Sequence, residues 1–106
     1  MKLPDNMGDL FAQMQKLQEN MGNVQKDMET REIEASAGGG MVTVKMSGAQ
    51  IVTSLKIDKA VVDPTDIEML EDLIRAAVNE AVRKSRDMMK QELGKLTGGL
   101  PIPGFN

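Results

Sequence analysis

Apolar residues recur at alternating steps of three and four between residues 7 and 28. The spacing forms a heptad pattern of about three repeats, which places a narrow apolar stripe along one side of a helix. It therefore predicts a long first helix over residues 7–30. This stripe either covers the chain's own sheet or helix, or contributes to a dimer. Its residues are Met7, Leu10, Met14, Leu17, Met21, Val24 and Met28.

From Arg31 the period changes to two, which predicts a three-stranded antiparallel sheet over residues 31–58. Gly38–Gly40 and Ser47–Ala49 mark the two turns, because these residues tolerate tight backbone geometry. A sheet this small is marginal alone, so we expect a helix on its apolar face and a partner at one of its edges. The residues expected on the apolar face are Ile33, Ala35, Ala37, Val42, Val44, Met46, Ile51, Thr53, Leu55 and Ile57.

A second long helix is predicted over residues 64–96, where the period returns to that of a helix. Its start has two candidate caps: Asp63 with Pro64 in the first turn, or a capping box of Thr65 with Glu68. The chain is therefore of the α+β class. The residues expected on the apolar side of this helix are Ile67, Leu70, Ile74, Val78, Ala81, Ser85, Met88 and Met89.

The segment 97–106 is rich in Gly and Pro and cannot continue the helix. It is either an extended arm that docks its apolar residues or a mobile tail. At 106 residues the chain is expected to form one domain with a small core, which association with a second copy would enlarge.

Composition removes several kinds of chemistry. The chain has no Cys and no His, so it lacks thiolates and the side chain most used for proton transfer and zinc binding. No Ser or Thr has a base in a spacing that would activate it. We therefore expect no enzymatic activity, no cofactor, no metal and no small-molecule substrate. The absence of a long apolar run predicts a soluble, cytoplasmic protein without membrane contact.

The charge balance narrows the possible partners. With 13 Lys and Arg against 16 Asp and Glu, the net charge is −3, so any contact with DNA must come from a local patch. Arg83, Arg86 and Lys90 fall within an arc of about 60° on the second helix, opposite its apolar side. This row is either a solvated face or a surface that lies along phosphates.

Two other bases on the same helix have candidate partners within it. Glu71 with Arg75, and Glu80 with Lys84, stand in the favourable order of acid four residues before base. These predicted ion pairs account for Arg75 and Lys84 without any ligand.

Several motifs resemble the YbaB/EbfC family of bacterial nucleoid-associated proteins, over almost the whole chain. The most specific is Leu-Glu-Asp-Leu-Ile at residues 70–74, followed by Asn-Glu-Ala at residues 79–81. The others are Gly-Gly-Met-Val-Thr-Val at 39–44, Ser-Gly-Ala at 47–49, Ile-Asp at 57–58, Gly-Gly-Leu-Pro at 98–101 and Pro-Gly at 103–104.

The resemblance implies a homodimer whose paired helices project like tweezers. It also implies a protein of the nucleoid that binds double-stranded DNA with little or modest sequence preference and alters its shape. Roles in nucleoid organisation, DNA protection or gene expression follow from the same resemblance. It attributes binding to the helices, which points to Arg83, Arg86 and Lys90, and more weakly to Lys16, Lys26 and Arg31.

A rival interpretation is a protein-interaction or scaffold dimer in which DNA contact is incidental. In that case the apolar stripe of the first helix and the segment 97–106 would hold a protein partner. Both the stripe and a sheet edge remain candidates for the dimer interface.

Overall fold

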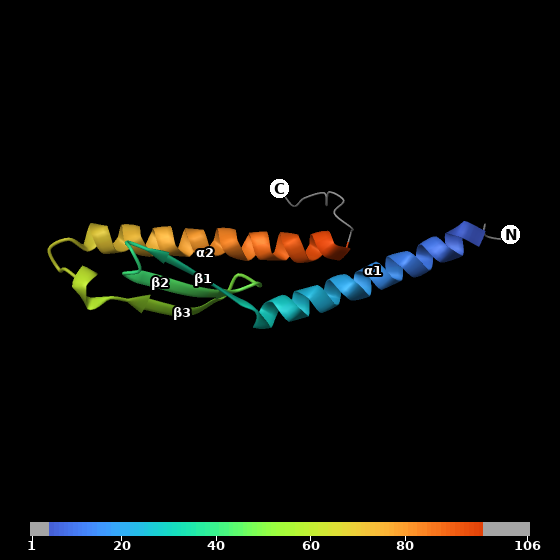
Figure 1. Cartoon of the computed structure of the whole chain (residues 1–106), viewed down its shortest axis with the longest axis horizontal. Coiled ribbons are helices and arrows are strands. Elements are labelled where there is room, and N and C mark those ends of the chain that lie inside the picture. The colour runs from blue at the N-terminus through green and yellow to red at the C-terminus, as the bar shows by residue number, and fades with distance from the viewer. Residues whose placement is uncertain (1–4, 97–106) are drawn as a thin grey trace.

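The computed structural model describes residues 5–96, and Figure 1 shows their arrangement. It confirms the predicted α+β class, with two long helices and a three-stranded antiparallel sheet. The predictions for the segment 97–106 lie outside the described residues. In chain order the elements are α1 (Asp5–Thr30), β1 (Glu32–Ala37), β2 (Val42–Ser47), β3 (Val52–Ile57), the short 3₁₀ helix η1 (Lys59–Val61) and α2 (Ile67–Leu96).

The sheet has the order β1-β2-β3, and α2 lies across one of its faces (Figure 1). Gly38–Gly40 joins β1 to β2 with three consecutive positive φ angles of 64°, 67° and 94°, a run that glycine adopts far more readily than other residues. Apolar side chains of β1 and β2 meet small residues of α2 to form the core. Its buried members are Ala35, Val42, Val44, Met46, Val61, Ala77 and Ala81.

The third strand departs from the predicted alternation. Thr53 is an extra residue in β3 between the partners of Lys45 and Met46, and its hydroxyl donates to the Lys45 carbonyl at 3.2 Å. Because this bulge breaks the period of two, Val52 rather than Thr53 lies opposite the buried Met46, so the predicted place of Thr53 on the apolar face is wrong. Ile51 precedes the strand and is 61% exposed, so its predicted place on the apolar face is wrong.

The second helix begins later than predicted, at Ile67. Asp66 is its cap, because its carboxylate accepts a hydrogen bond from the Met69 N–H at 3.3 Å. The carboxylate of Asp63 is used in the preceding turn, where it accepts from the Thr65 N–H and hydroxyl at 2.9 and 2.7 Å. These bonds lower the pKa of Asp63, and both predicted caps are wrong.

The buried side of α2 is made mainly of small residues. Ala77, Ala81, Ser85 and Leu93 are buried, of which Ala81 and Ser85 were predicted from periodicity. Ile67, predicted on the same side, is 47% exposed in the first turn. Alanine has little side chain to hold a helix away from a sheet, so α2 approaches β1 and β2 closely at these positions.

The first helix contacts the rest of the chain only towards its C-terminal end (Figure 1). Met28 is buried, whereas the N-terminal half projects past the end of α2 with its apolar residues uncovered. The interpretation that this stripe covers the chain's own sheet is therefore wrong for that half. The uncovered residues are Met7, Leu10, Phe11, Met14 and Leu17, which are 38% to 67% exposed.

Candidate nucleic-acid interface

The two helices meet at a tightly packed junction. Arg31, just after α1, forms an ion pair with Glu92 of α2 at 3.0 Å. The Arg31 carbonyl accepts a hydrogen bond from the Gly48 N–H at 2.9 Å, so the turn between β2 and β3 joins the same junction. Met28 packs directly against Gly48. This arrangement fixes the end of α1, the turn and α2 relative to one another.

An open hollow of about 1050 Å³ lies beside this junction. Its walls come from α1, from the β2–β3 turn and from the flank of α2 between the predicted basic row and the buried side. Apolar side chains such as Met21, Val82 and Met89 form part of the lining. The polar side chains suited to a nucleic acid are Gln25, Gln50, Asn79, Arg83, Arg86 and Lys90.

Arg86 and Lys90 are the cations of this hollow that are available to a ligand. Both are exposed, and neither forms an ion pair within residues 5–96. They lie four residues apart on α2 and therefore project from the same side of the helix. A guanidinium and an ammonium in this position can hold adjacent phosphates, the first through paired donors and the second as a point charge.

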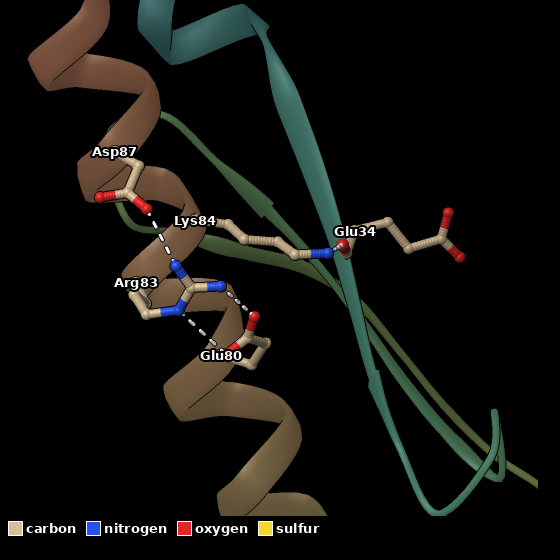
Figure 2. Close-up of polar contacts among 5 residues, drawn as sticks. All are labelled: Glu34, Glu80, Arg83, Lys84 and Asp87. Atoms are coloured by element: carbon tan, nitrogen blue, oxygen red, sulfur yellow. Dashed lines mark hydrogen bonds and ion pairs between the residues drawn. The ribbon is translucent and has the colours of Figure 1, made fainter.

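Arg83 is committed to partners on its own helix. Figure 2 shows its guanidinium between the carboxylates of Glu80 and Asp87, with Nε 3.1 Å from Glu80 and Nη1 3.0 Å from Asp87. The bond with Arg83 lowers the pKa of Glu80, and Glu80 raises that of Arg83. The predicted basic row therefore contains two unpaired cations and one that is largely neutralised.

Both predicted ion pairs of acid and base four residues apart are wrong. Lys84 reaches across to β1, where its Nζ donates to the Glu34 carbonyl at 2.9 Å (Figure 2), and Glu80 pairs with Arg83 instead. A guanidinium offers two parallel donors to a carboxylate, which favours it over an ammonium in the competition for Glu80.

In the other predicted pair, Arg75 binds Asp72 rather than Glu71. A residue three positions away on a helix is as close as one four positions away, so spacing alone did not distinguish the two acids.

The three weaker DNA-binding candidates, from the first helix and its end, differ in their surroundings. Lys16 and Lys26 are exposed on α1, make no ion pair among the described residues and lie outside the lining of the hollow. Arg31 pairs with Glu92 at 3.0 Å and approaches Asp27 at 3.8 Å. Arg31 therefore ties α1 to α2, whereas the two lysines remain open to solvent.

Gln25 and Gln50 line the hollow but were not singled out from the sequence. Their carboxamides each offer donors and an acceptor beside the cations. Gln25 lies in a polar stretch of α1 with no distinguishing spacing, and Gln50 follows the predicted turn at Ser47–Ala49. The predicted turn is the only sequence signal near Gln25 or Gln50. A predicted turn does not indicate which residues lie beside it in the folded chain.

The ion pair between α1 and α2 predicts an acid-sensitive junction. The hydrogen bond from Arg31, and then that from Lys95, lower the pKa of Glu92 below its usual value of 4.5. Stabilisation by this carboxylate is therefore complete above pH 4.5 and is lost as the pH falls through the lower pKa of the folded state. We expect Glu92→Gln to lower the midpoint of thermal unfolding at neutral pH, and the difference from wild type to shrink as the pH falls through the lowered pKa of Glu92 in the folded state.

The matched control is Glu71→Gln, because Glu71 is exposed and makes no ion pair among the described residues. Its unfolding midpoint should follow that of the wild type across the same pH range. Equal midpoints for Glu92→Gln and wild type at neutral pH would contradict a stabilising role for the Arg31–Glu92 pair.

Residues 5–96 contain neither a membrane-spanning helix nor a metal-binding cluster. No helix in that range is long and apolar enough to cross a membrane. No group of three or more His, Cys, Asp and Glu side chains in that range is placed to hold a metal ion. The chemistry that the hollow offers is hydrogen bonding and the binding of anions.

The fold and the hollow together define a class: a helix–sheet–helix chain with unpaired cations and amides on the flank of its second helix. The profile of the YbaB/EbfC DNA-binding family matches residues 1–100, so the chain belongs to this family. The sequence resemblance to this family is confirmed.

Curated relatives carry the name nucleoid-associated protein. One from Alkaliphilus metalliredigens is 54% identical over 100 residues, which cover 94% of this chain and 88% of the relative. Another, from Syntrophobacter fumaroxidans, is 55% identical over 95 residues, which cover 90% of this chain and 86% of the relative. Both alignments extend across the two helices and the sheet.

A solved structure has the same fold. The crystal structure of the uncharacterized protein HP0035 from Helicobacter pylori matches with a TM-score of 0.73 and 18% sequence identity. The match covers 92% of this chain and 100% of that one. At this identity the likeness concerns the fold alone.

Proposed function

We propose that this chain binds double-stranded DNA through phosphates, as a non-enzymatic homodimer of the bacterial nucleoid in the cytoplasm. Residues 1–106 would act as one domain. Binding would show little or modest sequence preference and would alter the conformation of the DNA, serving nucleoid organisation, DNA protection or gene regulation. The observation that carries the proposal is the pair of exposed, unpaired cations Arg86 and Lys90 at the hollow of a chain from a DNA-binding family.

The charges around the hollow support a phosphate contact at this place. The net charge of −3 disfavours attraction of DNA to the surface as a whole, so binding depends on where cations are free. On α2 the free cations are Arg86 and Lys90, while Arg83 is held by two carboxylates. We assign Arg86 and Lys90 the main role, Lys16 and Lys26 an auxiliary role along α1, and Arg83 and Arg31 a smaller one.

Uncovered apolar residues support association with a second copy. The N-terminal half of α1 exposes a row of large apolar side chains, and Val52 and Leu55 of β3 are 46% and 47% exposed beside the face that α2 covers. A short sheet with an open edge and an apolar flank is marginal without a partner. A dimer would also present two hollows to one duplex and so raise its affinity.

A second candidate is a scaffold protein that binds another protein through the exposed apolar residues of α1. The observation that favours it is the row from Met7 to Leu17, which has no partner within the described chain. This candidate predicts retention of a protein partner that persists at high salt, since apolar contacts are not screened by ions.

The experiment that separates the two candidates is a titration of labelled duplex with the wild-type chain at rising salt. We expect binding of two duplexes of unrelated sequence and equal A·T content with similar affinity, and a steep loss of affinity between about 50 and 200 mM salt as counterions are displaced. A parallel pull-down tests for a protein partner. A chain that shifts no duplex at about 50 mM salt, but retains a protein partner at high salt, would contradict the proposal and support the scaffold.

A further inference from the structure

The turn between β2 and β3 is anchored to both helices. The Ser47 carbonyl accepts a hydrogen bond from the Ser85 hydroxyl of α2 at 3.0 Å, and both residues are buried. On the other side, the Gly48 N–H donates to the Arg31 carbonyl at 2.9 Å, and Met28 closes over Gly48. The base of the turn therefore cannot shift without disturbing α1 and α2.

Gln50 at the tip of this turn has a backbone conformation that is unfavourable for its side chain. Its φ is 64°, and it is the one non-glycine residue within residues 5–96 with a positive φ. A residue with a Cβ is destabilised there relative to glycine. The turn holds it in place: the Gln50 N–H donates to the Ser47 carbonyl at 2.9 Å, and the Ser47 N–H to the Ile51 carbonyl at 2.8 Å. Such outliers are common at functional sites.

The Gln50 side chain faces the same hollow as the two free cations. It is exposed, lines the hollow with Arg86 and Lys90, and makes no side-chain hydrogen bond among those found in the described residues. A phosphate oxygen only accepts hydrogen bonds, and Arg86 and Lys90 already provide donors for it. A carboxamide both donates and accepts, which matches the edge of adenine, where a donor and an acceptor lie side by side.

We propose that Gln50 contacts base edges of A·T pairs in a duplex whose phosphates lie on Arg86 and Lys90. The inference rests on the proposed function, because it requires the duplex to occupy the hollow. The anchored turn fixes the backbone from which the carboxamide projects, so little backbone freedom is lost on binding. Gln50 then supplies a modest preference for A·T-rich DNA on top of phosphate binding that is independent of sequence.

The test uses Gln50→Gly and Gln50→Asn in the full chain, with one A·T-rich and one G·C-rich duplex of equal length. Glycine suits the positive φ, so we expect Gln50→Gly to keep or raise the midpoint of thermal unfolding. Its affinity for the A·T-rich duplex should fall about fivefold or more, and its preference between the duplexes should disappear. The salt dependence should be unchanged, because no phosphate contact is lost. Asparagine tolerates this φ and keeps the amide, so Gln50→Asn should retain part of the preference.

The outcomes distinguish this inference from the proposed function. Wild-type protein that binds both duplexes equally, or a Gln50→Gly variant that binds like wild type while Arg86→Ala binds more weakly, would overturn the role of Gln50 and leave the proposed function standing. If Gln50→Gly lost affinity equally for both duplexes and had a shallower salt dependence, the role of Gln50 in base contact would also be overturned, because that result indicates a phosphate contact. Wild-type protein that binds neither duplex would overturn both.

Discussion

Replacing Arg86 and Lys90 together by Ala is expected to weaken binding of duplex DNA by about tenfold to a hundredfold. Hydrogen bonds to charged groups contribute about 1.5–3 kcal/mol each when shielded from water, and exposure at the hollow lowers this contribution to about 0.7–1.4 kcal/mol for each cation. The loss should be the same for unrelated duplexes, because phosphates carry no sequence. The slope of log affinity against log salt should become shallower by about 2 for each chain in contact with the DNA. Fluorescence anisotropy over a salt series measures both quantities.

The matched control for this prediction is Lys59→Ala with Arg75→Ala. It removes the same number of positive charges from exposed residues that lie outside the hollow. We expect the control to bind DNA within about twofold of wild type, because distant surface charges are screened by salt. An equal loss in the control and the Arg86/Lys90 variant would contradict the site, since it would make total charge the determinant.

Gly48→Ala is expected to destabilise the protein by about 1–3 kcal/mol, the usual range for an added group in a closely packed site. A Cβ at this position would lie 2.7 Å from the Met28 Cβ and 2.8 Å from the Met28 carbonyl oxygen. Either α1 or the turn must then move, and the hydrogen bond between Gly48 and Arg31 is strained with it. Urea denaturation at one fixed protein concentration measures the loss.

Gly22→Ala provides the opposite result in the same assay. Nothing lies within 4 Å of a Cβ placed on Gly22, which is in the interior of α1. Alanine has the higher helix propensity, so the variant should be more stable than wild type by up to about 1 kcal/mol. If Gly48→Ala proved as stable as Gly22→Ala, the close packing of α1 against the turn would be contradicted.

Much of the fold could be predicted from the sequence because periodicity reports which face of an element is apolar. The change from a helical period to a period of two at Arg31 located the sheet, and three consecutive glycines located its first turn. The core positions Ala77 and Leu93 were harder to predict. Alanine carries little hydrophobic signal, and Leu93 is buried although it lies outside the core cluster on the sheet.

The ion-pair partners and the helix cap were harder to predict, because two similar acidic residues compete for each role. Glu71 and Asp72 are equally plausible partners for Arg75 by spacing, and Asp63 and Asp66 are equally plausible caps. In each case the choice follows from side-chain geometry that the sequence does not specify. The bulge at Thr53 is of the same kind, because a single extra residue leaves almost no trace in an alternating pattern.

Only part of the candidate site could be predicted from the sequence. The rest depends on ion pairing and on tertiary contacts. Helical spacing predicts the basic row on α2. Whether each cation of the row is paired with a carboxylate depends on how the neighbouring side chains are placed in the folded chain. Arg83 forms ion pairs with Glu80 and Asp87, whereas Arg86 and Lys90 form no ion pair within the described residues. The amides opposite them come from α1 and a turn, so their proximity is a product of tertiary structure.

The measurement that tests the central claim most directly is an NMR titration of the ¹⁵N-labelled chain with a short duplex, with chemical shifts followed residue by residue. The account predicts changes concentrated around the hollow, at the Arg86 and Lys90 amides and in the side-chain amides of Gln25, Gln50 and Asn79. Changes confined to the apolar row of α1 from Met7 to Leu17, or no changes at a salt concentration of about 50 mM, would contradict it.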